Sequence, residues 1–466
     1  MIEKIKKQIE LNKDKKAYIS GNEAITYQEL WEQANHYSRL LKKQGKSPVI
    51  LYGDNSLIFI VAILSCILAE RTYVPVGKCC PLERLKEIIK ITDSSVILTK
   101  EIIDINTIPV IHQLEELEEY NDEKEYSFHN DIIYIIFTSG STGKPKGVPI
   151  NRANLNNFID WLNQLDPLST YKNCNVFNQA NFSFDLSVAD LYYSLTNGHT
   201  LYDLEQDIQE NYESFFKIFQ NIEVAFLTPT YSRLCMLDPD FNEKYMKKLK
   251  CIYFCGEVLD QNTVKKLWER FPHLRVINAY GPTEATSAVS GIEITKEMLQ
   301  EERLPIGIDS NFATDISIVE NEIILKGPSV FKGYIGNIVG GYYQENNIDC
   351  YKTGDIGYIK DHKLYCKGRV DNQIKFKGYR IELEEIDYHI KTIKGVIDCV
   401  TIAKEENDKV KAIKSFVMVN QIDKEEIKKE LEKKIPSYMI PKTIQIVEEL
   451  PITNNKKIDR KALSRL

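Results

Sequence analysis

The sequence has no apolar run long enough to span a membrane. The longest such run, residues 57–68, lies between Asp54 and Glu70, whereas a membrane-spanning helix needs about 20 consecutive apolar residues. We therefore expect a buried helix there. Residues 1–7 are charged and amphipathic and lack the apolar segment of a signal peptide. These absences predict a cytoplasmic protein that does not insert into a membrane.

Cysteine pairs with metal-binding spacing are also missing. The chain has ten cysteines, and no two of them form a CxxC pair. A chain of 466 residues does not need disulfides to stabilise a small core, so we interpret the cysteines as reduced thiols. The 60 basic and 67 acidic residues give a net charge of −7. This balance argues against a nucleic-acid partner, which favours basic surfaces.

The order of apolar segments predicts an α/β protein of two or three domains. Short β-branched runs alternate with amphipathic helical segments, which favours layered, largely parallel sheets. The pattern ends in a turn at residues 368–371, and a lysine-rich α+β unit follows. We expect a large N-terminal domain over residues 1–370 and a small mobile domain over 371–466. The expected strands lie at residues 48–51, 96–98, 132–137, 224–227, 251–254 and 275–277, and expected helices at 82–91 and 263–271.

Residues 138–147 form the strongest local signal. They read Thr-Ser-Gly-Ser-Thr-Gly-Lys-Pro-Lys-Gly and follow an expected strand. Hydroxyl groups, backbone amides and two lysines can surround polyphosphate oxygens and neutralise their charge. The spacing does not fit the GxxxxGK[ST] motif, which disfavours a P-loop NTPase. A flexible surface loop is the alternative to a phosphate loop. The candidate ATP-binding residues of this loop are Thr138, Ser139, Gly140, Ser141, Thr142, Gly143 and Lys146.

Four further segments complete a resemblance to the adenylate-forming superfamily. They lie at residues 278–284, 351–355, 368–382 and 450–460 and occur in the family's order. The superfamily contains acyl-CoA synthetases, luciferases and the adenylation domains of nonribosomal peptide synthetases. Five ordered motifs along almost the whole chain are far more specific than any one of them. The resemblance implies that a carboxylate is adenylated by ATP and that the acyl group is then passed to a thiol.

The resemblance also implies roles for residues of the large domain. Tyr280 would stack on adenine, Thr283 would donate to the α-phosphate, and Glu284 would bind Mg²⁺ as a hard oxygen ligand. Asp355 would accept hydrogen bonds from the ribose hydroxyls. Taken singly, these residues also fit a core tyrosine, a solvated glutamate and a turn aspartate. The remaining ATP-binding candidates are Gly256, Glu257, Asn278, Gly281 and Arg369.

Two residues near and beyond the expected domain boundary have implied roles. Lys457 would reach the carboxylate and the α-phosphate, where an ammonium group stabilises the negative charge that develops during adenylation. The family usually has glycine before this lysine, whereas this chain has Lys456, which stays an alternative. The following Ile-Asp-Arg at residues 458–460 favours Lys457. Asp371 would be the hinge between adenylation and thioester formation.

The substrate is indicated by Asp185, which resembles the aspartate that pairs with the α-ammonium group in amino-acid-activating members. A buried carboxylate is costly unless it is paired, so Asp185 argues against fatty and aryl acids. A helix cap is the structural alternative for Asp185, and Asp190 is a second candidate for the ammonium partner. Lys457 would also approach the substrate carboxylate.

Within the superfamily, the chain most resembles the D-alanine–D-alanyl carrier protein ligases. The likeness lies at residues 181–188, 254–259 and 280–286. In those enzymes the cysteine matching Cys255 confines the pocket to a small D-amino acid. The chain departs from them by shorter connections around residues 320–323 and 333–343 and by Ser287. The other expected pocket residues are Gly281 and Val289.

These features predict a ligase that uses ATP and Mg²⁺ to activate a small amino acid, with D-alanine favoured. The acceptor would be the phosphopantetheine of a carrier protein supplied in trans, because no carrier segment follows Leu466. Glycine, L-alanine, β-alanine or serine as the substrate of a free-standing peptide-synthesis enzyme is an alternative. An acyl- or aryl-CoA synthetase is disfavoured by Asp185. An inactive adenylate-binding protein is disfavoured by the complete motifs.

Overall fold

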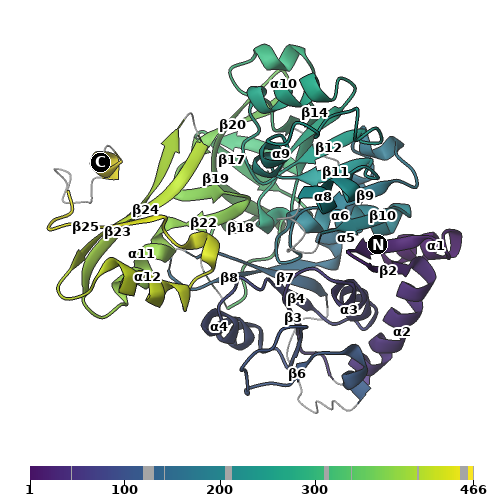
Figure 1. The fold of residues 1–466 in the computed structure, drawn as a ribbon, viewed down its shortest axis with the longest axis horizontal. Helices are drawn as coiled ribbons and strands as arrows, with labels where there is room; N and C mark the ends of the chain where they lie inside the picture. The colour runs from purple at the N-terminus through teal and green to yellow at the C-terminus, as the bar shows by residue number, and fades with distance from the viewer. Residues whose placement is uncertain are drawn as a thin grey trace.

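The computed structural model consists of a large part and a smaller part that lies against one side of it (Figure 1). It combines parallel sheets with helices in the large part and an α+β unit in the small part, as the sequence predicts. All ten cysteines are free thiols, in agreement with the expected reduced state. The structure describes residues 1–43, 45–118, 131–140, 142–204, 212–308, 314–336, 338, 340–406, 409–451 and 460–464.

Two largely parallel sheets form the centre of the large part. Among the described residues, the first has the order β14-β13-β12-β11-β9-β10-β1-β2 and the second β6-β5-β3-β4-β7-β8. Antiparallel pairing is confined to β14, β2 and β8 at the sheet edges in the part that the structure describes. The strands of the first sheet are β1 (Lys16–Ser20), β2 (Glu23–Thr26), β9 (Asn175–Asn178), β10 (Thr200–Asp203), β11 (Val224–Leu227), β12 (Cys251–Phe254), β13 (Arg275–Tyr280) and β14 (Ser290–Glu293). Those of the second are β3 (Val49–Tyr52), β4 (Tyr73–Val76), β5 (Val96–Leu98), β6 (Val110–Ile111), β7 (Ile132–Thr138) and β8 (Lys146–Asn151).

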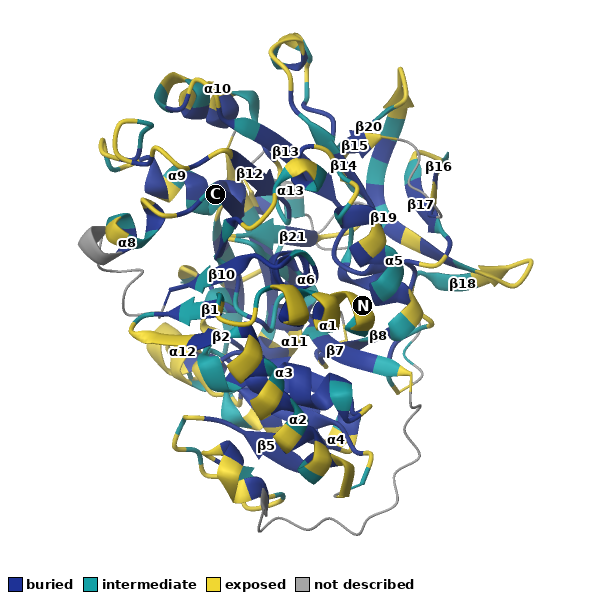
Figure 2. Ribbon diagram, turned by 90° about the vertical axis from the view of Figure 1, so that its right-hand side faces the viewer, coloured by how far each residue is buried: buried dark blue, intermediate teal, exposed yellow. Residues whose placement is uncertain are grey.

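Helix α3 (Leu57–Leu68) packs between these two sheets. Its buried side chains share one hydrophobic core with Tyr18 of β1 and Leu51 of β3, and Figure 2 colours most of the helix dark blue, for buried. The expected buried helix is therefore confirmed. Across the described residues, no helix is both long enough and apolar enough to cross a lipid bilayer. The other helices of the large part are α1 (Ile2–Leu11), α2 (Tyr27–Lys43), α4 (Leu82–Thr92), α5 (Arg152–Leu162), α6 (Leu186–Asn197), α8 (Tyr212–Phe219), α9 (Pro229–Cys235) and α10 (Gln261–Arg270).

A third sheet, which is antiparallel, connects the large part to the small one. Its order is β15-β20-β19-β17-β16, with β18 paired to β19. The strands are β15 (Gly307–Ile308), β16 (Asp315–Val319), β17 (Glu322–Lys326), β18 (Tyr342–Glu345), β19 (Ile348–Lys360) and β20 (Lys363–Arg369). The small part contains β21 (Gln373–Phe376), β22 (Tyr379–Glu382), α11 (Leu383–Lys391), β23 (Val396–Glu406), β24 (Lys409–Val419), α12 (Lys424–Glu432), β25 (Thr443–Ile446) and α13 (Arg460–Leu463).

The carboxyl ends of the parallel strands bring the candidate residues together. Thr138 ends β7, Tyr280 ends β13, and Cys255 directly follows β12. In open α/β sheets, ligands bind in the crevice outside these strand ends. The hairpin β21–β22 of the small part lies at this edge, where the Gly378 amide donates to Glu257.

Asn55 joins the two parallel sheets by hydrogen bonds. Its Nδ2 donates to Oδ1 of Asn178 at 3.1 Å, and its Oδ1 accepts from the Phe182 amide at 2.7 Å. Asn178 in turn donates to Oδ1 of Asp190 at 2.8 Å. The network therefore fixes the start of the loop that carries Asp185, and it also contains the carboxyl group of Asp203.

The buried carboxyl of Asp203 predicts that stability falls as the pH rises. Burial raises its pKa to about 7 from 3.8, although Tyr18 and Asn55 donate hydrogen bonds to it. Because the pKa of Asp203 is raised in the folded state, the stability that its protonated carboxyl group contributes is complete below about pH 4. That stability is lost as the pH rises through about 7. Between about pH 5 and pH 7 the loss should be about 2–3 kcal/mol.

Thermal melting across this pH range tests the effect of Asp203. Asp203→Asn should flatten the pH dependence, because the amide cannot ionise. Asp315→Asn, at an exposed position of β16, is the matched control and should melt like the wild type. Equal pH dependence in the Asp203→Asn protein and the wild type would contradict the assignment.

Candidate active site

The loop between β7 and β8 is packed closely against the small part. Thr138 and Ser139 are buried. Gly143 has a φ of +81°, and a Cβ atom there would lie 2.0 Å from the Tyr388 ring, so the contact requires glycine. Thr142 is exposed, and Nζ of Lys146 lies 3.8 Å from Glu382. Ser141 lies outside the described residues.

Glu284 is a buried carboxylate with two partners. The Tyr334 hydroxyl donates to its Oε1 at 2.6 Å, and Nη1 of Arg380 lies 2.5 Å from its Oε2. Burial by itself raises the pKa of Glu284, but the Arg380 charge and the Tyr334 hydrogen bond hold it below its usual value. The carboxylate is therefore ionised at neutral pH, and it can hold a cation.

Tyr280 and Asp355 form a second polar pair. The Tyr280 hydroxyl donates to Oδ2 of Asp355 at 2.6 Å, and Arg369 donates to Oδ1 at 2.7 Å. Arg369 also binds both carboxylate oxygens of Asp371, each at 2.7 Å. Nζ of Lys375 lies 5.7 Å from the centre of the Tyr280 ring. The expected hinge residue is thus connected to the expected ribose ligand through a single arginine.

Asp185 lies at the start of α6 but does not cap it. In the described part of the chain, its side chain makes no capping hydrogen bond, and Thr283 Oγ1 donates to its Oδ2 at 2.6 Å. Burial raises the pKa of Asp185, and the Thr283 bond and the charge of Lys375 offset only part of this. Such a carboxylate favours a cationic partner. The structure does not support the helix-cap interpretation.

Cys255 lies close to Asp185 and behaves as a small apolar side chain. Burial raises the pKa of its thiol to about 12, and the Asp185 charge adds to this effect. The thiol is therefore neutral, and a neutral cysteine packs as a small hydrophobic residue. Asp190 lies elsewhere, in the Asn55 network.

The segment after Glu284 folds tightly back over Gly281. A Cβ atom at Gly281 would lie 2.5 Å from Cα of Ala288. Thr286 and Ser287 both have positive φ angles, 61° and 70°, and Val289 is fully buried. Ser287 Oγ is buried and has no hydrogen-bond partner among the described residues. This polar group lies three residues after Glu284 in the compact turn.

Glu257 receives the tip of the small part's hairpin. Its Oε1 accepts from the Gly378 amide at 2.6 Å, and its Oε2 accepts from the Thr230 amide at 2.9 Å. Gly256 beside it has a φ of +88°. Asn278 is turned away from these contacts, because its Nδ2 donates to the Pro305 carbonyl at 2.8 Å.

The terminal segment is anchored on the outer side of the small part. Arg460 donates to the Thr401 carbonyl and lies 3.2 Å from Asp387. In Figure 1 the C-terminal end lies far from the large part. Lys456 and Lys457 fall outside the described residues, so their expected place remains a prediction.

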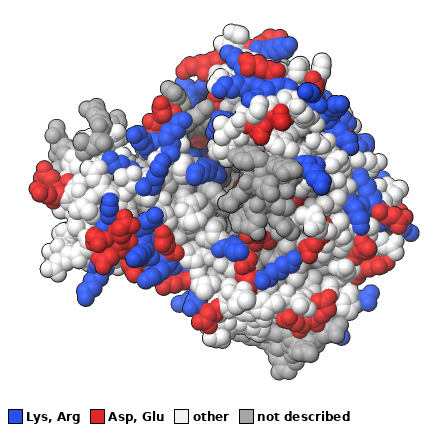
Figure 3. All heavy atoms as spheres, viewed as in Figure 1, with Lys and Arg blue, Asp and Glu red and all other residues white. Residues whose placement is uncertain are grey.

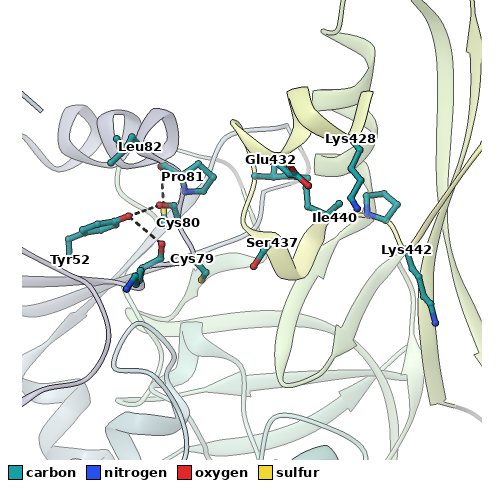
Figure 4. A pocket seen from close by; sticks show the side chains of 13 residues that line it. Tyr52, Cys79, Cys80, Pro81, Leu82, Lys428, Glu432, Ser437, Ile440 and Lys442 are labelled. Carbon is teal, nitrogen blue, oxygen red and sulfur yellow. Dashed lines mark hydrogen bonds between the residues drawn. The ribbon is translucent and has the colours of Figure 1, made fainter. Parts of the chain in front are cut away.

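An open groove of about 710 Å³ lies where the two parts meet. Figure 4 shows residues 79–82 on one side, and Lys428, Glu432 and Ser437 of the small part on the other. The charged residues that line the groove are Glu432 and three lysines, Lys78, Lys428 and Lys442. The lining therefore has a net positive charge. Elsewhere on the face shown in Figure 3, acidic and basic side chains are interspersed.

Two family models match the chain in succession. One, described as AMP-binding enzyme, matches residues 5–335, and one described as AMP-binding enzyme C-terminal domain matches residues 385–457. The chain belongs to the AMP-binding enzyme family. The resemblance found in the sequence is therefore confirmed.

Curated ligases are similar to this chain over its whole length. The D-alanine–D-alanyl carrier protein ligase of Bacillus licheniformis is 36% identical over 99% of this chain and 98% of the relative. The enzyme of the same description from Listeria monocytogenes is 37% identical over 100% of this chain and 98% of the relative. Both alignments span the two parts of the fold.

Solved structures of adenylation domains share the fold. The Vibrio cholerae adenylation domain AlmE, in complex with glycyl-adenosine-5'-phosphate, has a TM-score of 0.84 and 24% identity, covering 100% of this chain and 97% of that chain. A nonribosomal peptide synthetase protein containing adenylation and PCP domains has a TM-score of 0.83 and 22% identity, covering 100% and 84%. At these identities the likeness supports the fold alone.

Sequence reasoning did not assign several residues that meet at the site. Arg380 lies within a recognised motif, and a charged side chain two residues after Gly378 could have marked it as a site residue. No local sequence pattern marks Tyr334, Lys375 or Glu385, because each reaches the site only through packing between segments far apart in the chain.

Proposed function

We propose that this protein is an ATP-dependent ligase that activates a small amino acid, with D-alanine favoured, and transfers it to the phosphopantetheine thiol of a carrier protein. The observation that carries this proposal is the half-buried Asp185 carboxylate, which accepts a hydrogen bond from Thr283 and lies near Cys255. A carboxylate that is partly withdrawn from water favours a cationic partner, and the ammonium group of an amino acid provides one. The description of the two curated relatives supports D-alanine as the substrate.

ATP and Mg²⁺ would bind across the strand ends. The amides and hydroxyls of residues 138–147 would surround the phosphates, and Asp355 would receive the ribose hydroxyls beside Tyr280. Glu284 fits Mg²⁺, because its buried, ionised carboxylate requires a cation, a place that Arg380 fills in this structure. Mg²⁺ binds through one or two carboxylates. The ion would neutralise charge on the phosphates.

Adenylation and thiol transfer would use two positions of the small domain. We propose domains over residues 1–370 and 371–466, with Asp371 as the hinge. In the arrangement described above, the hairpin β21–β22 lies at the site, and adenylation would require Lys457 to reach the carboxylate and the α-phosphate. Rotation about Asp371 would let the small domain serve the two steps in turn, and hinge residues that absorb such changes are common in enzymes that close over their substrates.

Lys457→Ala should abolish most ATP–pyrophosphate exchange driven by D-alanine. The exchange rate should fall by roughly 10²–10³, as when one placed transition-state donor is removed. Transfer from preformed aminoacyl-adenylate should be much less affected. Lys456→Ala is the matched control and should retain most exchange. If Lys456→Ala is instead the crippling change, the assignment of the terminal lysine is wrong.

Asp185→Asn should raise KM for the amino acid and largely spare KM for ATP. Leaving a buried charge unpaired costs about 3–5 kcal/mol, which corresponds to roughly 10²–10³ or more in KM. Asp190→Asn tests the alternative ammonium partner and should leave KM unchanged. Exchange assays with D-alanine, L-alanine, glycine and propionate measure these effects. Activity with propionate equal to that with D-alanine would refute an ammonium-binding role for Asp185.

The groove at the junction would receive an acidic carrier surface and its phosphopantetheine arm. Its three lysines favour a negatively charged partner through electrostatic complementarity. The double variant Lys428→Glu/Lys442→Glu should raise KM for the carrier about tenfold at low salt, with a smaller effect at high salt. Pyrophosphate exchange should not change. Lys429→Glu, exposed on the same helix, is the control, and an equal effect there would exclude a specific docking surface.

A further inference from the structure

Glu385 brings a buried negative charge onto the phosphate loop. It lies in the first turn of α11, is fully buried, and its Oε2 accepts a hydrogen bond from the Gly140 amide at 2.7 Å. Its Oε1 forms an ion pair with Arg84 of α4, which is also buried. Gly140 and Arg84 both belong to the large part, so this contact exists only when the small part is docked.

The rest of the docked surface closes around the same loop. Ser139 Oγ donates to the Arg380 carbonyl at 2.9 Å and lies 2.9 Å from the Glu382 amide, which donates to it. The Tyr388 ring covers Gly143. Backbone and hydroxyl donors of a loop suited to phosphate are therefore occupied by groups of the small part.

The charges of the docked small part match those of a metal–phosphate pair. Arg380 places a cation 2.5 Å from Glu284, the residue proposed to hold Mg²⁺. Glu385 places an anion on Gly140, within the loop proposed to hold phosphate. A carboxylate and a phosphate are both strong acceptors for backbone amides. Two anions within a few ångströms in a buried site repel strongly, so they cannot share this amide.

We propose that Glu385, held by Arg84, is a positioning residue that takes the place of a pyrophosphate oxygen on the phosphate loop. Bound magnesium pyrophosphate and the docked small domain then exclude each other. The small domain therefore docks after pyrophosphate has left. The adenylate can then react with the thiol but can no longer be converted back to ATP by pyrophosphate. The inference rests on the proposed function in one respect, the assignment of residues 138–147 as the phosphate site.

Hydrogen–deuterium exchange with Mg²⁺ and inorganic pyrophosphate tests this exclusion directly. In the unliganded wild type, amides of residues 373–388 should be protected, since Gly378 and Glu382 donate across the junction. Saturating magnesium pyrophosphate should remove that protection. In the Glu385→Gln protein these amides should be less protected without ligand. The pyrophosphate concentration that removes half of the protection should be about tenfold lower than in the wild type, because the competing docked state is less populated.

The neighbouring carboxylate provides a matched control. Glu384→Gln removes the same charge one residue away, where Glu384 contacts Asn372 and Arg460 instead of the phosphate loop, and it should behave as the wild type. Arg84→Met should reproduce Glu385→Gln from the other side of the contact. This second variant keeps the test valid if Glu385→Gln melts at a lower temperature.

The outcomes separate this inference from the proposed function. If the wild type binds pyrophosphate but keeps its hairpin protected, or if Glu385→Gln and the wild type respond alike, the exclusion is overturned. If the wild type does not bind pyrophosphate at all, the assignment of the phosphate loop fails, and the proposed function with it. Thiol transfer by Glu385→Gln should also be slower and about tenfold more sensitive to pyrophosphate, with pyrophosphate exchange retained.

Discussion

The ion pair between Arg380 and Glu284 is the contact on which the arrangement of the two parts depends. Glu284 is 1% exposed, and Arg380 approaches it to 2.5 Å. A charge buried this deeply is stable only with a partner. Glu284 therefore requires a cation, and in this structure Arg380 of the small part supplies it. The charge of Glu284 is thereby connected to the position of the small part.

The large part prepares the site for this exchange. Parallel strands end at one edge, which places Thr138, Cys255 and Tyr280 around a common crevice. Tyr334 holds Glu284 in place by its hydroxyl, and Asn55 fixes the loop that leads to Asp185. These contacts lie within the large part and do not involve the small one. The crevice can therefore stay formed while its cationic and anionic partners change.

Much of the fold and part of the site could be predicted from the sequence, because those features are local. Each of the six expected strands is present, as β3, β5, β7, β11, β12 and β13, and both expected helices are present as α4 and α10. The loop at residues 138–147 and the segment ending at Glu284 are continuous motifs, so their composition revealed them. The curated relatives support the same family and the same kind of ligase.

The remaining site residues depend on tertiary contacts that no local pattern encodes. Glu385 looks like any solvated glutamate of an amphipathic helix until α11 is placed beside Arg84. Tyr334 reaches Glu284 across a separation of 50 residues. The sequence singles out Asp185, but only the structure rejects its capping alternative. The terminal Lys457 and Ser141 lie outside the described residues and stay predictions.

A disulfide between residues 228 and 378 would test the central claim that the docked small domain and adenylation exclude each other. A Cβ atom at Gly378 would lie 3.9 Å from Cβ of Thr228, close to the ordinary spacing of about 3.8 Å in disulfides. The oxidised Thr228→Cys/Gly378→Cys protein should lose D-alanine-dependent pyrophosphate exchange, yet transfer D-alanine from preformed adenylate to a thiol, and reduction should restore exchange. Undiminished exchange by the fully oxidised protein would contradict the account.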